Sequence, residues 1–176
     1  MGNEPPDYCP HCGGELVAVD PPTVHRCRDC ERESFYNPTP SARVAVLDGD
    51  AILLCAVGVE NYWETPGGRP EAAEDPPVAA ARELREETGL RVDPNDLVRF
   101  DVRGFESIPD RYKIRHCYAV ERADTTGEPT AGDEPAAVRF WTPEAFEAAD
   151  ARLSERQPAE TRDLAWWVSR ARDARR

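Results

Sequence analysis

Apolar and polar positions along the middle of the chain follow the patterns of strands. Two apolar runs, in ARVAVLDGDAILLCAVG, flank Asp48-Gly49-Asp50, which predicts a β-hairpin over about 42–58. Further strands are expected near 97–106, 112–121 and 137–141.

The segment between the hairpin and the later strands has the pattern of a helix. Asp75 suits the N-cap and Pro76 the first helical position, and the alanines that follow, with Leu84, favour helix. Gly89 then marks the end of this helix.

Two more helices are expected in the last third of the chain. Thr142 can cap a short helix that begins at Pro143. In the stretch ETRDLAWWVSRARDA, one helical face collects four apolar residues: Leu164, Trp167, Val168 and Ala171. Strands on either side of a central helix, followed by helices, predict a mixed α/β domain.

The first part of the chain, 1–38, has few large apolar residues but contains two C-x-x-C pairs. Cys9 pairs with Cys12 and Cys27 with Cys30, at a spacing close to that of a zinc ribbon. Four thiolates close a tetrahedral zinc site and leave no open position, so such a zinc is structural. Because a segment this small cannot build its own core, a Zn²⁺ staple would explain its folding.

The cysteines and the residues near them also allow assignments other than a zinc ribbon. Two disulfides are the alternative, which the lack of an export signal disfavours. We do not expect His11 or His25 to be ligands, because four cysteines suffice. Cys55 and Cys117 lie in apolar runs and are expected to pack in the core, and YNPTPS is expected to form a linker.

The charge of the chain limits its partners. It has 176 residues and a net charge of −12, with 34 acidic residues against 22 basic ones. Such a surface repels phosphate backbones, so we do not expect a nucleic-acid partner. The near absence of lysine fits either a salt-loving cytoplasm or a GC-rich genome, and the sequence does not separate the two.

The hydropathy of the chain limits its location. No stretch of eighteen apolar residues occurs, so no membrane span is expected. The start, MGNEPPDYCP, has neither the basic nor the apolar region of a secretory signal, so we expect a cytoplasmic protein.

The predicted central helix carries three carboxylates on one face. Glu83 is three residues from Glu86 and four from Glu87, so their side chains share a face and repel one another. The array becomes favourable when Mg²⁺, which prefers oxygen ligands and bridges carboxylates to phosphates, lies between them. The alternative is an ordinary exposed helix face, neutralised by Arg82 and Arg85.

A fixed spacing favours the metal site over the exposed face. Gly68 is followed after five residues by Glu74, and after a further seven by RELREETGL at 82–90. This stretch matches the Nudix box, G-x5-E-x7-R-E-U-x-E-E-x-G-U with U a bulky aliphatic residue, at all nine fixed positions. The chain therefore resembles the Nudix hydrolase family, in the box at 67–90 and over about 39–150.

The resemblance implies a fold and a division into domains. The expected fold is α/β, a Nudix-like α/β/α sandwich with a mixed sheet, in which the box forms a loop–helix–loop. A small zinc ribbon over 1–38 would precede the Nudix hydrolase domain over 39–150. The remaining residues, 151–176, would provide a C-terminal helix that packs on the Nudix domain.

The resemblance also implies roles for the box residues. Glu83, Glu86 and Glu87 fall on the glutamates that bind Mg²⁺ or Mn²⁺, and the first of these often serves as general base. Arg82 falls on the arginine that orients these carboxylates, so the expected catalytic residues are Arg82 and the three glutamates. Gly67 falls where a main-chain oxygen can complete the metal coordination.

Three loop positions ahead of the helix also bear on the resemblance. Glu74 matches the first glutamate of the box, which in the family supports the loop. The family often has a bulky apolar residue where Pro70 stands and glycine where Ala73 stands. These two departures remove no metal ligand.

The activity implied by the resemblance is hydrolysis of a pyrophosphate bond in a nucleoside diphosphate linked to another moiety. Expected substrates are small molecules: ADP-ribose, an NADH-like dinucleotide or a modified nucleotide. The ribbon is similar to that of the NADH pyrophosphatase group, but the SQPWPFPxS signature of that group is reduced to SERQP at Ser154–Pro158. We therefore expect no particular specificity for NADH.

Other functions remain open at this point. The Nudix fold could serve as a non-catalytic module for ligand sensing or protein binding, and the ribbon could be a docking module. The chain could form a homodimer, as related enzymes often do. Five aromatic residues are candidates for stacking on a base: Tyr62, Trp63, Phe105, Tyr112 and Trp141.

Overall fold

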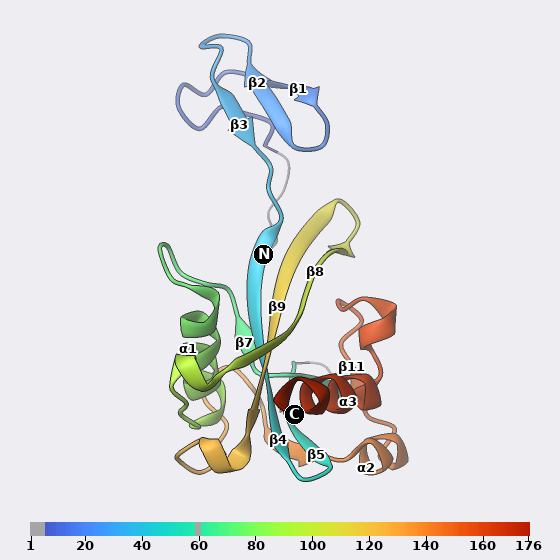
Figure 1. The fold of residues 1–176 in the computed structure, drawn as a ribbon. Helices are drawn as coiled ribbons and strands as arrows, with labels where there is room; N and C mark the ends of the chain where they lie inside the picture. Colours follow the sequence, from blue (N-terminus) through green and yellow to red (C-terminus); the bar gives the residue numbers. More distant parts are fainter. Residues whose placement is uncertain (1–5, 59–60) are drawn as a thin grey trace. The chain divides into compact units, whose positions relative to one another are not determined.

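The computed structural model describes residues 6–58 and 61–176, which form two compact units (Figure 1). The first unit contains the described residues up to Thr39 together with Gly104–Lys113. The second unit contains Pro40–Arg103 and Ile114–Arg176, within the described range. None of the helices in the described part of the chain has the length and apolar character needed to cross a bilayer.

The first unit is built on a three-stranded antiparallel sheet. Strands β1 (Leu16–Asp20), β2 (Val24–Cys27) and β3 (Glu33–Phe35) follow one another in the order β1-β2-β3. Among the described residues of this unit, the apolar core cluster consists of Cys9, Leu16 and Cys27, with Cys30 packed against it.

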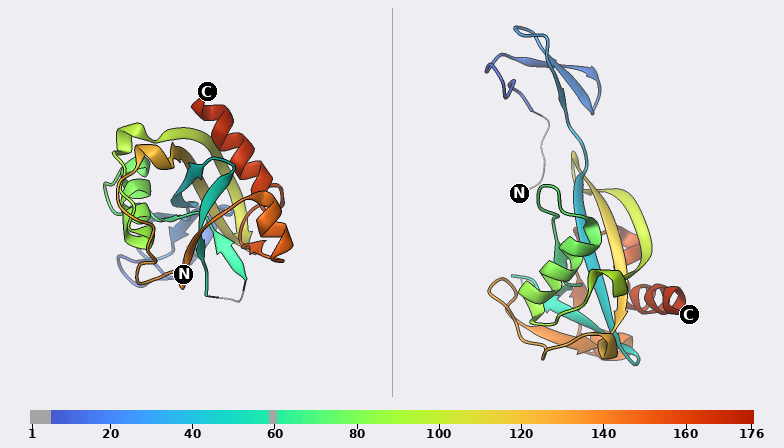
Figure 2. Two further views of the ribbon diagram at one scale, coloured as in Figure 1. Left: turned by 90° about the horizontal axis from the view of Figure 1, so that it is seen from below. Right: turned by 60° about the vertical axis from the view of Figure 1, so that its left-hand side comes forward.

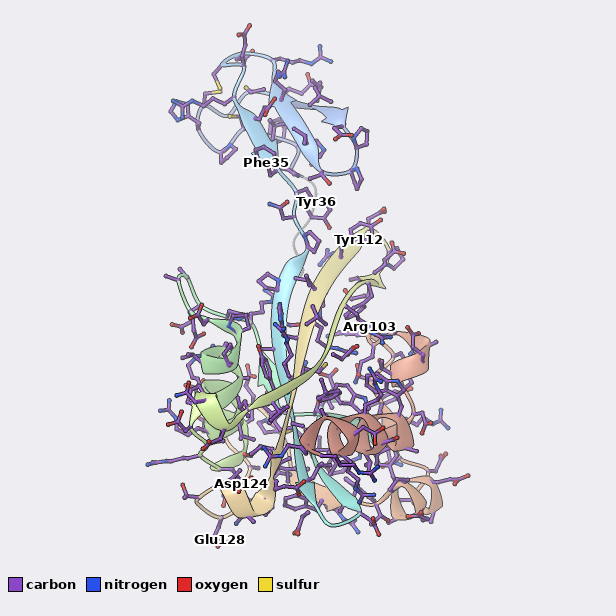
Figure 3. All side chains as sticks on the ribbon, in the orientation of Figure 1. Phe35, Tyr36, Arg103, Tyr112, Asp124 and Glu128 are labelled. Carbon is purple, nitrogen blue, oxygen red and sulfur yellow. The ribbon has the colours of Figure 1, made fainter. Side chains whose placement is uncertain are left out.

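Within the first unit, Tyr36 contacts the hairpin tip at Gly104–Lys113. Its hydroxyl donates a hydrogen bond to the carbonyl oxygen of Asp110. Its ring meets the ring of Tyr112 edge-on, with centroids 6.4 Å apart (Figure 3). The linker in the structure is shorter than the predicted one, YNPTPS, because the next strand already begins at Thr39.

The second sheet has eight strands, most of them antiparallel. Six strands follow the order β11-β6-β5-β4-β9-β8, while β10 pairs with β5 and β7 with β4. Because β11 pairs with β6 in parallel, the sheet is mixed, as predicted. The bounds are β4 (Thr39–Asp48), β5 (Ala51–Ala56), β6 (Tyr62–Glu64), β7 (Gly67–Gly68), β8 (Val98–Ile108), β9 (Arg111–Glu121), β10 (Val138–Trp141) and β11 (Arg152–Leu153).

Helices cover both faces of this sheet (Figure 2). One face packs against α1 (Pro76–Thr88), and the other against α2 (Pro143–Ala148) and α3 (Leu164–Arg175). Each face of the sheet has its own apolar core, because successive side chains of β4 point to opposite faces. Val44 and Val46 face α1, whereas Ala45 and Leu47 face α3. The prediction of an α/β/α sandwich is confirmed.

The ends of α1 fall where the sequence predicts them. Asp75 is the N-cap, although its side chain makes no capping hydrogen bond, and Pro76 is the first helical residue. Gly89 ends the helix in the left-handed conformation, with φ of 72°, and its N–H donates to the carbonyl oxygen of Arg85. Within the helix, Leu84 is fully buried, whereas Glu86 is exposed and Glu83 and Glu87 are half-buried.

Candidate active site and metal centre

Arg82 is the centre of the candidate active site. Its Nε and one terminal nitrogen donate to both oxygens of Glu74, at 3.0 and 2.9 Å. Its other terminal nitrogen donates to Glu83 Oε1 at 3.0 Å and to Glu86 Oε2 at 3.1 Å. The carboxylate of Glu74 raises the pKa of Arg82, and Arg82 in turn lowers the pKa of Glu74. One guanidinium thus holds the loop and the helix of the box together.

Glu87 is held from the other side of the site. The backbone N–H of Gly67 donates to Glu87 Oε2 at 2.8 Å. Burial raises the pKa of Glu87 to about 7, although the charge of Arg43 and the Gly67 N–H act in the opposite direction. In the metal-free chain this carboxyl therefore carries a proton for part of the time near neutral pH.

Two glycines allow the box loop to approach its neighbours closely. Gly67 has φ of 140°, and a Cβ there would lie 2.1 Å from the carbonyl oxygen of Ala42. A Cβ on Gly68 would lie 2.4 Å from Glu83 Oε1. Any larger residue at either position would displace β4 or the Glu83 carboxylate.

These residues line a cavity of about 700 Å³, the larger part of which is bounded by charged side chains. Gly67, Arg82 and the three predicted glutamates all line this cavity, although the carboxylate oxygens of the glutamates do not all lie within 4.8 Å of one another. The lining residues are Gly67, Gly68, Arg69, Glu71, Arg82, Glu83, Glu86, Glu87, Asp133 and Glu134.

Asp133 and Glu134 are the lining residues outside the box, and sequence reasoning missed them, as it missed Arg69 and Glu71 within the box. They lie on a loop that runs beside the C-terminal end of α1, where the N–H of Thr130 donates to the carbonyl oxygen of Thr88 at 2.8 Å. The N–H of Gly132 donates likewise to the carbonyl oxygen of Glu87, at 3.0 Å. The acidic pair in AGDEP was a possible signal, but no fixed spacing links it to the box.

The four cysteines of the first unit form a second centre. Their sulfur atoms all lie within 4.8 Å of one another, and the group contains neither His11 nor His25. Two of the separations are 3.7 Å, from Cys9 to Cys30, and 3.5 Å, from Cys12 to Cys27. Among the described residues, no other group of three or more potential ligands is gathered in this way.

Backbone amides point at the first cysteine of each pair. The N–H groups of His11 and Cys12 lower the pKa of Cys9 to about 7, and those of Cys30 and Asp29 lower the pKa of Cys27. This stabilises thiolates, which are the form that binds metal.

The remaining candidates from the sequence lie outside the cavity. Cys117 is buried in the core as expected, and Cys55 is buried with its sulfur 3.9 Å from Glu87 Oε2. Trp141 is buried in the core, and the partly buried Trp63 packs against it edge-on, with ring centroids 5.1 Å apart. None of the five aromatic candidates is among the residues that line the 700 Å³ cavity.

Comparison with known proteins agrees with this geometry. The family model of the NUDIX domain matches residues 37–164. A NAD-capped RNA hydrolase, NudC, of Pseudomonas aeruginosa is 33% identical over 87 residues, which cover 48% of this chain and 31% of that protein. A CMP-5'-(N-acetyl-N-hydroxy-3-aminopropyl)phosphonate hydrolase of Streptomyces rubellomurinus is 38% identical over 119 residues, covering 63% of this chain and 55% of that protein.

A solved structure shows the same fold. The NUDIX hydrolase from Nitrosomonas europaea superposes with a TM-score of 0.65 at 22% identity and covers 83% of each chain. The matched part of this chain spans about a third of the length of the Pseudomonas relative. Since the family model covers well over half of the residues, the chain belongs to the NUDIX domain family of the Nudix hydrolases.

Proposed function

We propose that this protein hydrolyses a phosphoanhydride bond in a nucleoside diphosphate linked to another moiety, with a divalent metal ion. The observation that carries the proposal is the Arg82-centred array of carboxylates around a cavity of about 700 Å³. Two relatives of the chain, both named as hydrolases of nucleotide compounds, further support the proposal.

The chemistry of the ligand atoms fits Mg²⁺ or Mn²⁺. Every candidate ligand is an oxygen, from Glu83, Glu86, Glu87 and the main chain of Gly67, and hard cations prefer such sets. Glu134 lies close enough to Glu87 to raise its pKa, so we include it as a further candidate ligand. When bound, such an ion neutralises charge on the diphosphate and lowers the pKa of a water molecule.

The side chains of the site would have two tasks: Arg82 would orient the carboxylates, and Glu83 would accept a proton. Arg82 holds Glu83 and Glu86 in fixed orientations, which lowers the cost of assembling the site. Glu83 uses Oε1 to accept from Arg82, so its Oε2 is the atom that we assign as the acceptor of the proton from the attacking water.

We also propose that the four cysteines hold a structural Zn²⁺. A tetrahedral zinc with Zn–S bonds of about 2.3 Å separates its sulfurs by about 3.8 Å. The separations of 3.5 and 3.7 Å between cysteine sulfurs are close to this value. The ribbon would thereby gain the stabilisation that its small core does not provide.

A non-catalytic module is the second candidate, and the retained glutamates argue against it. A binding module would not need Glu83, Glu86 and Glu87 together with the arginine that orients them.

Docking of a protein to the ribbon remains testable with a pull-down that uses the full chain and a variant lacking 1–38.

The proposed function is tested by a hydrolysis screen with Mg²⁺ or Mn²⁺, at low and high salt. The panel includes ADP-ribose, NADH, modified nucleoside triphosphates and NAD-capped RNA, the last because of the name of one relative. Glu87→Gln should lower turnover at least about a hundredfold with the fold intact, because metal positioning is lost. Absence of metal-dependent turnover on the whole panel, or near-normal turnover in Glu87→Gln, would contradict the proposal.

A further inference from the structure

Arg43, on β4, connects the sheet to the segment that reaches Glu87. One of its terminal nitrogens donates to the carbonyl oxygen of Thr65 at 2.6 Å, and the other donates to Glu64 Oε2, also at 2.6 Å. The Arg43 side chain is 20% exposed and that of Glu64 is 15% exposed, so the pair is largely shielded from water. A shielded, charge-assisted contact of this kind fixes geometry more firmly than a surface ion pair does.

The same segment is also pressed onto β4 by its backbone. Arg43 pairs with Gly67 and Ala42 pairs with Gly68 in antiparallel register. The N–H of Val44 donates to the carbonyl oxygen of Pro66 at 2.9 Å. The absence of a Cβ on Gly67 allows this approach, since any Cβ there would overlap Ala42.

The segment 64–67 therefore has one end on Arg43 and the other on Glu87. Its final residue, Gly67, donates its N–H to Glu87 Oε2 at 2.8 Å. A shift of this segment would move Gly67 and, through the hydrogen bond, the carboxylate of Glu87.

We infer that Arg43 is a positioning residue, which fixes the segment 64–67 so that Gly67 and Glu87 meet in the geometry needed for metal binding. The inference rests on the proposed function and names a residue outside the box on which it depends. Arg43 and Glu64 would act through Gly67 and would not touch the substrate.

The other role open to Arg43 is contact with a substrate phosphate. Arg43 lines a hollow of about 360 Å³ that shares Gly67, Glu87 and Glu134 with the larger cavity. Both terminal nitrogens already donate to protein oxygens at 2.6 Å, which favours positioning. The two roles differ in kinetics, because a lost phosphate contact raises KM whereas a misplaced metal ligand lowers kcat.

The test compares Arg43→Lys with wild type in Mn²⁺ binding and in turnover. A lysine ammonium is a single point donor and cannot bridge Thr65 and Glu64 in the same planar geometry. Binding is followed by the electron paramagnetic resonance of free Mn²⁺, without substrate. We expect affinity for Mn²⁺ and kcat to fall by about 10- to 100-fold, with KM within about twofold of wild type.

Matched variants separate positioning from general damage. Glu64→Gln keeps an oxygen for Arg43 and should lose at most about threefold, whereas Glu64→Ala should lose about tenfold or more in Mn²⁺ affinity. Arg152→Lys is the control, because Arg152 is 61% exposed and pairs with Asp150 away from the cavity. If Arg43→Lys does not fold, the two Glu64 variants decide the question.

Two results would overturn the inference. A rise in KM with unchanged kcat and unchanged Mn²⁺ affinity would make Arg43 a substrate contact. Unchanged values of all three would leave it no role in the site. If wild type hydrolyses nothing on the panel, the proposed function fails, whereas the Mn²⁺ titration still decides the role of Arg43.

Discussion

Arg82 and Glu74 form a two-point contact, with both carboxylate oxygens of Glu74 held at 2.9–3.0 Å by one guanidinium. The contact spans eight residues and ties the loop ahead of α1 to the helix itself. It fixes the one side chain that also reaches Glu83 and Glu86, so the order of the active site depends on it.

Arg82→Lys should therefore lower kcat by about 10- to 100-fold, because a lysine cannot hold Glu74 and two further carboxylates at once. Steady-state kinetics with the best substrate of the screen measure the loss. The matched control is Arg85→Lys, since Arg85 is 54% exposed and its ion pair is with Glu86 alone among the described residues. Equal losses in the two variants would contradict the role given to Arg82.

Glu87 should make the stability of the metal-free protein depend on pH. Its pKa is about 7 in the folded chain against an ordinary value of 4.5, so the unfolded chain releases this proton first. Folding stability is then lost as pH rises from about 4.5 to about 7. Denaturation of wild type and Glu87→Gln in buffers without divalent metal, from pH 5 to 8, should show the stability of wild type falling relative to the variant. Parallel pH profiles would show that burial of Glu87 has no such effect.

Gly132→Ala should impair turnover although position 132 lies outside the box. A Cβ there would lie 1.9 Å from the carbonyl oxygen of Glu86, so the loop that carries Glu134 must move. A displacement of about 1 Å at a site can cost about a hundredfold in rate, so we expect a loss of at least about tenfold. Gly104→Ala is the control, because the nearest atom to its Cβ would be 3.9 Å away. Wild-type turnover in Gly132→Ala would show that the loop position is unimportant.

Ala73→Gly should stabilise the protein. Ala73 has φ of 65°, a left-handed conformation that costs an alanine about 1–2 kcal/mol. Glycine relieves this strain but costs about 0.5–1 kcal/mol in backbone entropy, so we expect a gain of up to about 1.5 kcal/mol in the free energy of unfolding. Ala81→Gly, inside α1, should instead lose about 1 kcal/mol. Chemical denaturation measures the free energy of unfolding of both variants. A lower value for Ala73→Gly than for wild type would contradict the claim that the backbone is strained at Ala73.

The purified protein should contain one zinc ion per chain. Four clustered sulfurs, two of which are stabilised as thiolates by backbone amides, favour a structural zinc site over a catalytic metal site with an open position. Elemental analysis of wild type and Cys27→Ser should show zinc in the first and little in the second. Wild type without zinc, and with Cys9 and Cys12 oxidised, would reverse the ribbon interpretation.

The box and α1 could be predicted from the sequence because local rules decide them. Asp75-Pro76 at one end and Gly89 at the other set the helix ends, and spacings of three and four bring Glu83, Glu86 and Glu87 to one face. Ala73 stands where the family often has glycine, and the structure gives it φ of 65°, a conformation that glycine adopts more easily than alanine.

The rest of the site depends on contacts between distant segments, which a single sequence does not reveal. Asp133 and Glu134 reach the cavity because Thr130 and Gly132 bind carbonyl groups left free at the end of α1, more than forty residues earlier. Arg43 reaches its acceptors only through the pairing of β4 with β7. Trp63 and Trp141 look like base-stacking candidates in isolation, and only tertiary packing places them in the core.

The central claim is that three glutamates of one helix, with the main chain of Gly67, hold a divalent metal ion. A crystal structure of the protein with Mn²⁺, in which anomalous scattering locates the metal, tests it most directly. We predict manganese bound by oxygens of Glu83, Glu86 and Glu87 next to Gly67. A cavity without manganese at saturating concentration, or manganese bound only elsewhere, would contradict the claim.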